Sequence, residues 1–318
     1  MAKAFIFPGQ GSQKVGMASA FVSGFESGMR VMEEIEEAIS FKISEIIAEG
    51  PVEELTKTEN AQPAIFATGM ACVAILEKEY GYEIARNVKY MAGHSLGEYT
   101  ALCAAGAMSI SDTAKLVRKR GKLMAAACPD RENYAMVALL GVGSGVIEPL
   151  VAPYQSGRNI CVIANDNSES QVVISGHRKA VEAVCKEAGH FGLAKAIELN
   201  VDGPFHCPLM SQAAIEFDEV LANVTTYRDC NIPVIMNFTA SPIIRRGDLP
   251  SSLVGQITGR VRWRETTDLL MNDREIDEII EIAPGRTLSK MLKRNYNEAN
   301  VRSLETVAQI AEFAKSGG

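Results

Sequence analysis

The sequence predicts an α/β fold with a smaller subdomain inserted into it. Strand-like apolar segments recur along the 318-residue chain with helical patterns between them, the alternation typical of α/β proteins. In the middle of the chain the order becomes strand, helix, strand, strand, helix and strand, which is that of a ferredoxin-like unit. We therefore expect one discontinuous α/β domain, residues 1–128 plus 202–318, and a ferredoxin-like subdomain over residues 129–201.

The larger domain is expected to contain four strands, read as short apolar segments bounded by turn residues. They are Lys3–Phe7, Val88–Ala92, Pro233–Phe238 and Glu278–Ile282. Two helical segments matter for function. Residues 98–107 directly follow the second strand, and residues 111–127 carry an apolar stripe at helical spacing.

The subdomain is expected to contain four strands and two helices. The helices are Ser144–Val151 and Lys179–Ala188, the second with its apolar residues on one face. A turn rich in Asn, Asp and Ser is expected over residues 165–170. The strands are Tyr134–Leu140, Ile160–Ala164, Gln171–Ser175 and Leu193–Leu199.

Composition and charge exclude several classes of protein. The net charge is −7, whereas nucleic-acid-binding domains usually carry a basic face, so we expect no nucleic-acid partner. No apolar run approaches the roughly 18 residues of a membrane span, and we expect neither membrane association nor a signal peptide. The seven cysteines form no CxxC pair, and no histidine–cysteine spacing indicates a metal site. We therefore expect reduced thiols, no metal and a cytoplasmic location.

The sequence Gly93-His94-Ser95-Leu96-Gly97 is a GxSxG motif between an expected strand and an expected helix. A serine at such a tight turn is strained, and glycines two residues before and after it make room for the backbone. The hydroxyl projects from the turn, while the amide of Leu96 is free to donate to an oxyanion. We predict that Ser95 is a nucleophile; the alternative is a purely structural turn.

A nucleophilic serine needs a base, and the chain has four histidines. His94 adjoins Ser95, and successive side chains diverge at a sharp turn, so it is a poor candidate. His177 precedes a subdomain helix, and His190 lies in a glycine-flanked turn. His206 lies between two prolines just after the subdomain, where a rigid loop would hold an imidazole in a cleft between domains. We predict that His206 is the base; the alternative is a histidine that only packs in that loop.

Arg120 is the most informative charged residue. It falls inside the apolar helical stripe formed by Leu116, Val117, Leu123 and Met124. A core-facing arginine must find an acceptor, because an unpaired buried charge is costly. One possibility is an internal salt bridge to Asp or Glu. The other is a fork for a substrate carboxylate, to which the guanidinium geometry is matched.

A glycine-rich loop follows the first strand, over residues 7–16. A dinucleotide fingerprint would need a glycine where the chain has Lys14, and the Gly-Lys-Ser/Thr of a P-loop is absent, so nucleotide binding is disfavoured. The glycines could instead bring the backbone close to an active site, with Gln10 lending its amide. The acidic run Glu33–Glu37 is expected to be a solvated helix face.

Several motifs occur in a specific order along the whole chain: Phe5–Gln13, Gly93–Tyr99, Arg120–Lys122, Ala164–Asn167 with Gln171–Gly176, and Pro204–His206. Together they resemble the malonyl-CoA:acyl carrier protein transacylase family of fatty-acid synthesis. The resemblance implies an α/β hydrolase-like core with an inserted ferredoxin-like subdomain. It implies transfer of a malonyl group from malonyl-CoA to the phosphopantetheine thiol of acyl carrier protein. It implies no cofactor, because the coenzyme A thioester is a substrate and the phosphopantetheine belongs to the partner.

The resemblance also implies roles for the candidate residues. Ser95 accepts the acyl group, and His206 acts as base and later as acid. The backbone amides of Gln10 and Leu96 form the oxyanion hole, and Arg120 holds the free malonyl carboxylate.

Further positions follow from the same resemblance. The family orients its histidine with a backbone carbonyl, which we assign to Gln256, and it has no acidic third member. Asn165 matches a polar position that faces the cleft. Phe205 fits the malonyl-type pattern, whereas Asp202 and Gly203 stand where small or hydroxyl residues are more usual.

Two other functions could use the same fold: a serine hydrolase such as a thioesterase, and a non-enzymic binding module. A buried arginine and the lack of an acidic triad partner favour transfer over hydrolysis. The carrier protein is typically acidic, so a chain of charge −7 needs a local basic patch to dock it. The candidates are Lys119, Lys122, Lys290, Lys293 and Arg294; the alternative for each is an ordinary solvated side chain.

Overall fold

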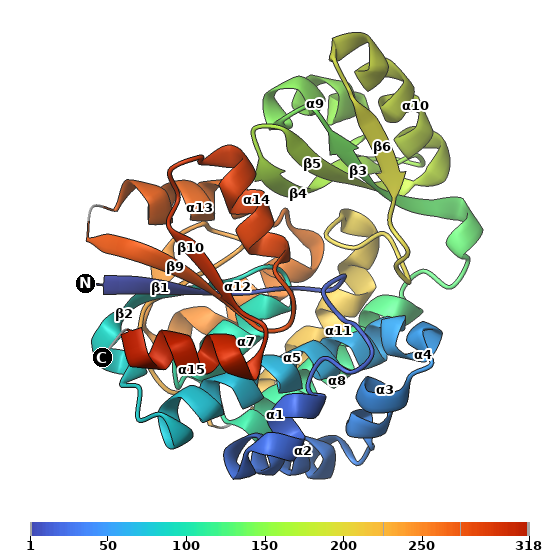
Figure 1. Ribbon diagram of the computed structural model, residues 1–318. Coiled ribbons are helices and arrows are strands. Elements are labelled where there is room, and N and C mark those ends of the chain that lie inside the picture. Colours follow the sequence, from blue (N-terminus) through green and yellow to red (C-terminus); the bar gives the residue numbers. More distant parts are fainter. Residues whose placement is uncertain (1, 225, 274, 317–318) are drawn as a thin grey trace.

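The structure is a computed structural model that describes residues 2–224, 226–273 and 275–316. It contains two β-sheets with packed helices, and the smaller sheet projects from one side of the larger body (Figure 1). The strands of the larger sheet come from chain segments before and after the smaller one. The α/β class predicted from the sequence is confirmed.

The larger sheet has six strands in the order β10-β9-β1-β2-β7-β8. Strands β10, β9, β1, β2 and β7 pair in parallel, and β8 runs antiparallel to β7. The strands are β1 (Ala2–Phe7), β2 (Val88–Gly93), β7 (Val234–Ile235), β8 (Pro242–Ile243), β9 (Ile276–Ile282) and β10 (Val301–Leu304). The sequence analysis had identified neither β8 nor β10, which contain two and four residues.

Strand β1 is buried on both faces, as is usual in a parallel sheet covered by helices. Phe5 and Phe7 belong to the apolar core on one face, and Ala4 and Ile6 to the core on the other. Side chains alternate along a strand, so a continuous apolar run serves both cores at once. This pattern explains why the segment is recognisable as a strand from its sequence.

Helices lie on both faces of this sheet (Figure 1). The helix α5 is buried along nearly its whole length and continues into a π-helical turn, Ile75–Glu79. The helices of the larger body are α1 (Ser19–Gly24), α2 (Glu26–Ile39), α3 (Ile43–Glu49), α4 (Val52–Thr56), α5 (Thr58–Ala74), α6 (Ile84–Asn87), α7 (Gly97–Ala104), α8 (Ile110–Ala126), α11 (Ser211–Ala222), α12 (Leu249–Thr258), α13 (Trp263–Asn272), α14 (Thr287–Asn295) and α15 (Val307–Ser316).

The smaller sheet is antiparallel, with the strand order β4-β5-β3-β6. The helices α9 and α10 pack on one face, in a core that includes Leu139, Ile163 and Val181. Met136 and Val173 point to the opposite face and join the core of the larger body. The elements are β3 (Tyr134–Leu140), α9 (Ser144–Val151), β4 (Cys161–Ser168), β5 (Gln171–His177), α10 (Arg178–Ala188) and β6 (Lys195–Glu198).

The predicted turn over residues 165–170 was wrong over residues 165–168, because β4 continues to Ser168. The amide of Asp166 donates to the carbonyl of Val261 at 2.9 Å, and the amide of Val261 donates to the carbonyl of Ala164 at 2.8 Å. This pairing, together with the ladder that β4 forms with β5 as far as Ser168, keeps the chain extended through residues whose composition favours a turn.

The predicted strand Pro233–Phe238 was too long, because β7 pairs only over Val234–Ile235. The backbone N–H of Asn237, which would continue the ladder, donates instead to the carboxylate of Glu98. The amide of Ala240 then closes a turn onto the carbonyl of Met236. A buried side chain has thus replaced a strand as the acceptor.

The prediction that the acidic run over residues 33–37 is a solvated helix face was only partly correct. It lies in α2, and Glu36 is buried, with its carboxylate accepting hydrogen bonds from Lys42 and Ser44. These bonds lower the pKa of Glu36 against the opposing effect of burial.

The two chain segments that connect the smaller sheet to the larger body, before β3 and after β6, lie beside the start of α5. Arg131, which precedes β3, forms an ion pair at 2.7 Å with Asp202, which follows β6. The other carboxylate oxygen of Asp202 accepts the amide of Thr58 at the start of α5, at 2.6 Å. This contact satisfies one of the free N–H groups of the helix N-terminus.

Among the helices in the described ranges, none combines the length and apolar character needed to cross a bilayer.

Candidate active site

Ser95 lies at the turn between β2 and α7, with φ = 50°, the left-handed region that is strained for a residue with a side chain. A Cβ on Gly93 would lie 1.9 Å from the carbonyl carbon of Gly97, and a Cβ on Gly97 would lie 2.1 Å from the carbonyl oxygen of Phe7. Only glycine fits at either position. The predicted strand–turn–helix context of the motif is therefore present. Its two glycines are needed, as expected, because a side chain at either position would collide with the backbone.

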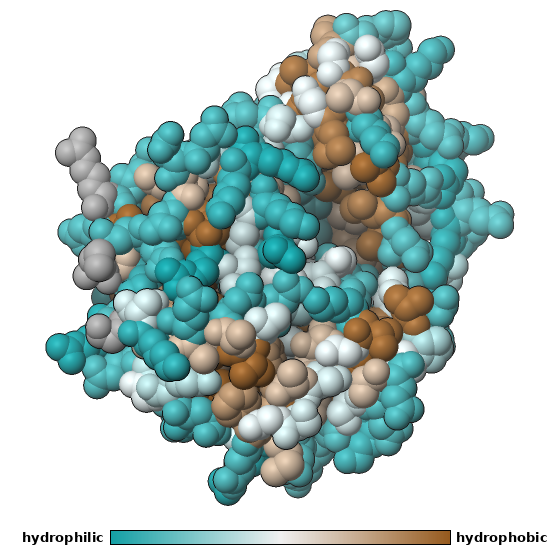
Figure 2. Space-filling model, in the orientation of Figure 1, coloured by the Kyte–Doolittle hydropathy of each residue, from teal (hydrophilic) through white to brown (hydrophobic). Residues whose placement is uncertain are grey.

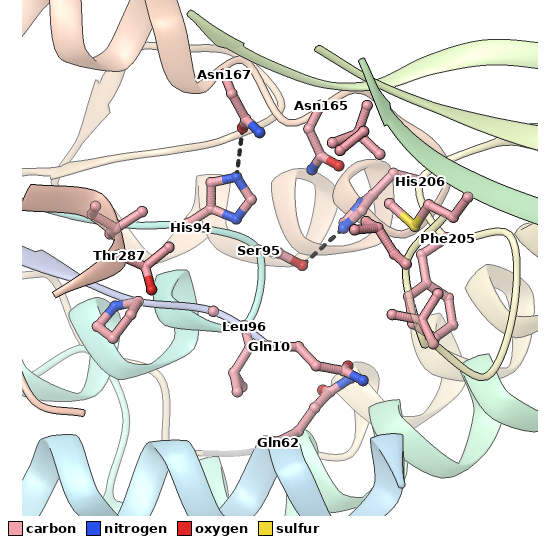
Figure 3. A pocket seen from close by; sticks show the side chains of 18 of the residues that line it. Gln10, Gln62, His94, Ser95, Leu96, Asn165, Asn167, Phe205, His206 and Thr287 are labelled. Carbon is pink, nitrogen blue, oxygen red and sulfur yellow. Dashed lines mark hydrogen bonds between the residues drawn. The ribbon is translucent and has the colours of Figure 1, made fainter. Parts of the chain in front are cut away.

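His206 lies against this serine. Its Nε2 is 2.8 Å from the Oγ of Ser95 (Figure 3). Its Nδ1 is 2.8 Å from the carbonyl oxygen of Gln256. Because a carbonyl oxygen can only accept, Nδ1 carries the proton and Nε2 is left free to accept from the serine hydroxyl. Burial, and secondarily the charge of Arg120, lower the pKa of His206 to about 3, so the imidazole is neutral at pH 7.

A pocket opens above these two side chains, between the smaller sheet and the larger body. Figure 2 shows it as a hollow with hydrophobic residues on the side of the smaller sheet. That wall is formed by apolar residues of β3, β5 and the chain after β6, namely Met136, Ala138, Val173, Leu199 and Val201. The floor is polar and holds Gln10, Gln62, Ser95, Arg120 and His206.

Arg120 reaches the pocket floor from α8 and is 1% exposed. Its guanidinium donates to the side-chain oxygens of Gln62 at 2.8 Å and Gln256 at 2.9 Å, and to the Oγ of Ser95 at 3.2 Å. It also lies 5.3 Å from the centre of the Tyr99 ring. Within the described ranges it forms no salt bridge, so the internal-acid alternative was wrong.

Gln10 and Leu96, whose backbone amides were predicted to form an oxyanion hole, both line the pocket with Ser95. A Cβ on Gly9 would lie 2.5 Å from the carbonyl oxygen of His94, so the glycine lets the loop after β1 approach the serine turn. The Gln10 side chain donates to the Oγ of Thr58 at 3.1 Å, which anchors this loop to α5. In the part of the chain that the structure describes, neither of the two amides has a hydrogen-bond acceptor.

The other predicted residues also lie at or near the pocket. Asn165 is 3% exposed and lines it from β4, and the backbone carbonyl of Gln256 contacts His206 as expected. His94 lines the pocket too, but its Nε2 bonds Asn167 at 2.9 Å and not the serine. His177 bonds the amide of Ile160 outside the pocket.

The remaining predicted positions lie outside the pocket. His190 is exposed on the smaller domain. Asp202, whose side chain turns toward α5, does not line the pocket, and neither does Gly203.

Two residues that hold the serine turn, Asn237 and Glu98, were not predicted from the sequence. Asn237 accepts the amide of Ser95 at 2.7 Å and donates to the carbonyl of Gly93 at 2.7 Å, which holds the strained turn from both sides. Glu98, fully buried in the first turn of α7, accepts from the side chain of Gln256 at 3.0 Å and from the amide of Asn237. No local pattern marks Asn237, because its partners are about 140 residues away in the chain.

A serine hydroxyl on a strained strand–helix turn, a neutral imidazole that accepts its proton and two free amides form the arrangement of acyl-transfer enzymes that use a covalent intermediate. A buried guanidinium beside the serine has the charge and geometry to pair with a carboxylate. The fold and the site therefore define an acyl-transfer enzyme. The chain belongs to the acyl transferase domain family, which it matches over residues 4–313.

Individual relatives narrow the class further. The chain is 40% identical over 291 residues to the malonyl CoA-acyl carrier protein transacylase of Bacillus subtilis (strain 168), covering 92% of this chain and 89% of the relative. Among solved structures it is similar to an acyl-carrier-protein-S-malonyltransferase from Bartonella henselae, with a TM-score of 0.93, 39% identity and 99% of both chains covered. It is also similar to a malonyl-transacylase solved in complex with its type II PKS acyl-carrier protein, with a TM-score of 0.92, 31% identity and 99% and 100% coverage.

Proposed function

We propose that the protein transfers a malonyl group from malonyl-CoA to the phosphopantetheine thiol of acyl carrier protein, for fatty-acid biosynthesis. The observation that carries this proposal is the guanidinium of Arg120, 3.2 Å from the Ser95 hydroxyl and bound only to amide and hydroxyl oxygens in the described ranges. An acyl group that ends in a carboxylate, attached at Ser95, would meet a planar cation matched to it. Relatives that bear this activity in their names share 31–40% identity with the chain over most of its length.

The first half-reaction loads the enzyme. Ser95 attacks the thioester carbonyl while its proton passes to Nε2 of His206, and the amides of Gln10 and Leu96 stabilise the oxyanion, each by about 3 kcal/mol. The intermediate collapses, the C–S bond breaks, and the imidazolium returns its proton to the leaving thiolate of coenzyme A. Malonyl-Ser95 remains, with its free carboxylate on Arg120.

The second half-reaction runs the same steps in reverse. The phosphopantetheine thiol of the carrier protein gives its proton to His206 and attacks the ester carbonyl of malonyl-Ser95. The oxyanion forms at the same two amides, the C–O bond breaks, and His206 protonates the Ser95 oxygen. The result is a ping-pong cycle that needs no further cofactor. The absence of a cofactor and the cytoplasmic location remain predictions.

We also propose a finer description of the fold. Residues 129–201 form a ferredoxin-like subdomain, supported by the strand order β4-β5-β3-β6 and by two helices packed on one face of the sheet. Residues 1–128 plus 202–318 form an α/β hydrolase-like catalytic domain, supported by parallel strands and a serine turn directly after β2. The pocket lies between the two.

Incubation with malonyl-CoA alone tests the proposed activity. We expect intact-protein mass spectrometry to show a stable gain of one malonyl group, and peptide analysis to place it on Ser95. The added mass should be lost when acyl carrier protein is added. Ser95→Ala is the matched control and should gain no mass. Rapid release of free malonate without an adduct would instead indicate a hydrolase, and no change in either variant would indicate a binding module.

Docking of the carrier protein is proposed at α14. Lys290 and Lys293 line a surface hollow together with Arg286 and Arg302, while Leu288 and Met291 on the same helix line the catalytic pocket. Within the described ranges neither lysine forms a salt bridge, so both charges are available to an acidic partner. Of the other candidates, Arg294 does not line this hollow, and Lys119 and Lys122 lie on α8.

Charge reversal on α14 should therefore slow transfer to the carrier protein more than loading. We expect Lys290→Glu with Lys293→Glu to lower kcat/KM for acyl carrier protein by about tenfold and to weaken its dependence on salt. The same double reversal at Lys119 and Lys122 is the control and should leave that constant unchanged. Stopped-flow or quench measurement of the two half-reactions gives both values. An equal effect of the two double variants would place the docking surface elsewhere.

A further inference from the structure

A buried carboxylate next to the site has no part in the steps described above. Glu98 lies three residues after Ser95 and is 0% exposed. Its Oε1 accepts from the Nε2 of Gln256 at 3.0 Å, and its Oε2 accepts from the backbone N–H of Asn237. Within the described ranges it has no salt bridge to a cation, and burial raises its pKa to about 8 despite these bonds and the nearby charge of Arg120. A group so costly to bury needs a structural or chemical reason.

Gln256, the partner of Glu98, contacts three parts of the site. Its Oε1 accepts from the Nη2 of Arg120 at 2.9 Å, and its backbone carbonyl holds the Nδ1 of His206 at 2.8 Å. Its Nε2 donates to the carbonyl of Ser95 at 2.9 Å as well as to Glu98. The amide of Gln256 thus lies between the carboxylate of Glu98 and the guanidinium of Arg120.

The orientation of this amide matters because its two ends have opposite chemistry. A guanidinium has no acceptor, and both carboxyl oxygens of Glu98 lie against N–H groups and therefore act as acceptors. With Oε1 toward Arg120 and Nε2 toward Glu98, both contacts are hydrogen bonds. A flipped amide would set donor against donor at Arg120 and acceptor against acceptor at Glu98. Glu98, together with the carbonyl of Ser95, therefore selects the orientation in which Gln256 can hold the guanidinium.

We propose that Glu98 is a positioning residue that fixes the Gln256 amide, thereby holds the Arg120 guanidinium beside Ser95, and so sets the preference of the site for a carboxylated acyl group. The inference rests on the proposed malonyl transfer and assigns part of its specificity to a residue that touches neither substrate nor serine side chain. The oxygen of Glu98 on Asn237 supports the serine turn in parallel, because Asn237 also accepts the amide of Ser95. Partners behind a binding group act in this way when they restrict its orientation.

The substitution Glu98→Gln tests the inference at nearly constant volume. It replaces one acceptor oxygen with an NH2 donor, which must face either the Nε2 of Gln256 or the N–H of Asn237. We expect malonyl loading of Ser95 to fall about 10- to 100-fold with a raised KM for malonyl-CoA, and acetyl loading to fall much less. Glu98→Asp keeps a carboxylate with two acceptor oxygens and should retain part of the malonyl preference.

The matched control is Glu36→Gln. Glu36 is another buried carboxylate; it lies on α2, outside the pocket, and accepts hydrogen bonds from Lys42 and Ser44. We expect it to lower the unfolding midpoint without changing the ratio of malonyl to acetyl loading. Loading of both acyl groups is measured by rapid quench and intact-protein mass spectrometry, and folding by urea unfolding. The ratio distinguishes positioning from general destabilisation.

An unchanged malonyl-to-acetyl ratio in folded Glu98→Gln, or an equal loss of both rates, overturns the inference. If Glu98→Gln does not fold, a wild-type ratio and wild-type KM in Glu98→Asp would support only a role in stability and also overturn it. The wild-type protein is measured beside the variants. A wild type that forms no malonyl adduct refutes the proposed function and this inference with it, whereas a normal wild-type adduct with an unchanged ratio refutes the inference alone.

Discussion

Replacing His206 with alanine is expected to slow malonyl loading of Ser95 by about 10²- to 10⁴-fold, the range found when a positioned general base is lost. The imidazole accepts from the Ser95 hydroxyl at 2.8 Å and is fixed by the Gln256 carbonyl at the other nitrogen. Within the described ranges no second base contacts the hydroxyl; its other partner is the permanently charged Arg120. The measurement is the rate of adduct formation by rapid quench and mass spectrometry.

The pH dependence follows from the same residue. Because the pKa of His206 is lowered to about 3, the imidazole stays neutral above about pH 4, and loading should show no titration near pH 6.5. The unfolded chain binds a proton at this histidine near pH 6.5, so stability falls as pH drops from 6.5 toward 3, by up to about 1.4 kcal/mol per pH unit. His206→Ala should lack this contribution. Its free energy of unfolding should therefore fall less between pH 6.5 and pH 5 than that of the wild type.

The control for His206 is His190→Ala, which removes an exposed histidine of the smaller domain. It should change neither the loading rate nor its pH profile. A loading rate in wild type that decreases with an apparent pKa near 6.5 would contradict the assignment of a deeply buried neutral base. So would a His206→Ala variant that loads at the wild-type rate.

Replacing Arg120 with alanine is expected to lower malonyl loading by more than about tenfold while acetyl loading is spared or improved. A carboxylate held by a buried guanidinium gains about 1.5–3 kcal/mol for each charge-assisted hydrogen bond, which an acetyl group cannot use. The side chain is 1% exposed, so the carboxylate would otherwise enter a site with little water. Kinetics with malonyl-CoA and acetyl-CoA, compared as kcat/KM ratios, give the measurement.

Arg118→Ala is the matched control for Arg120, because it removes an arginine from the same helix. Arg118 faces away from the pocket, where it donates to the carbonyl of Glu59 at 2.8 Å and lies 4.2 Å from the Phe41 ring centre. We expect this variant to lose stability but to keep the malonyl-to-acetyl ratio. An equal loss of malonyl and acetyl loading in Arg120→Ala would show that the arginine is structural.

The parts of this site that could be predicted from sequence depend on local rules. The strain at Ser95 demands glycines at fixed spacing, so the serine turn is legible over five residues. Arg120 could be singled out because helical periodicity shows which face of α8 is buried. The order of strands and helices in the smaller domain follows in the same way from short-range apolar patterns.

Local composition failed where a distant segment supplies the partner. Residues 165–168 look like a turn but remain in β4, because they pair with β5 and because Val261 bonds Ala164 and Asp166 on the other side. Asn237 looks like part of a strand but leaves it, because its N–H is taken by Glu98. In both cases hydrogen bonds to residues outside the segment outweigh a local preference that is small in free energy.

The serine turn, the charge in the pocket and the succession of elements were already contained in the order of amino acids, since each depends on neighbours within one turn or one helix. Folding alone settled what Arg120 contacts and why Glu98 is buried, and it brought the carbonyl of Gln256, which the family resemblance had indicated, to His206. Those answers depend on Gln256 and Asn237, which lie 50 or more residues away from the groups they hold. Hydrogen bonds act only over about 3 Å, so they become definite once the packed core has brought such remote segments together.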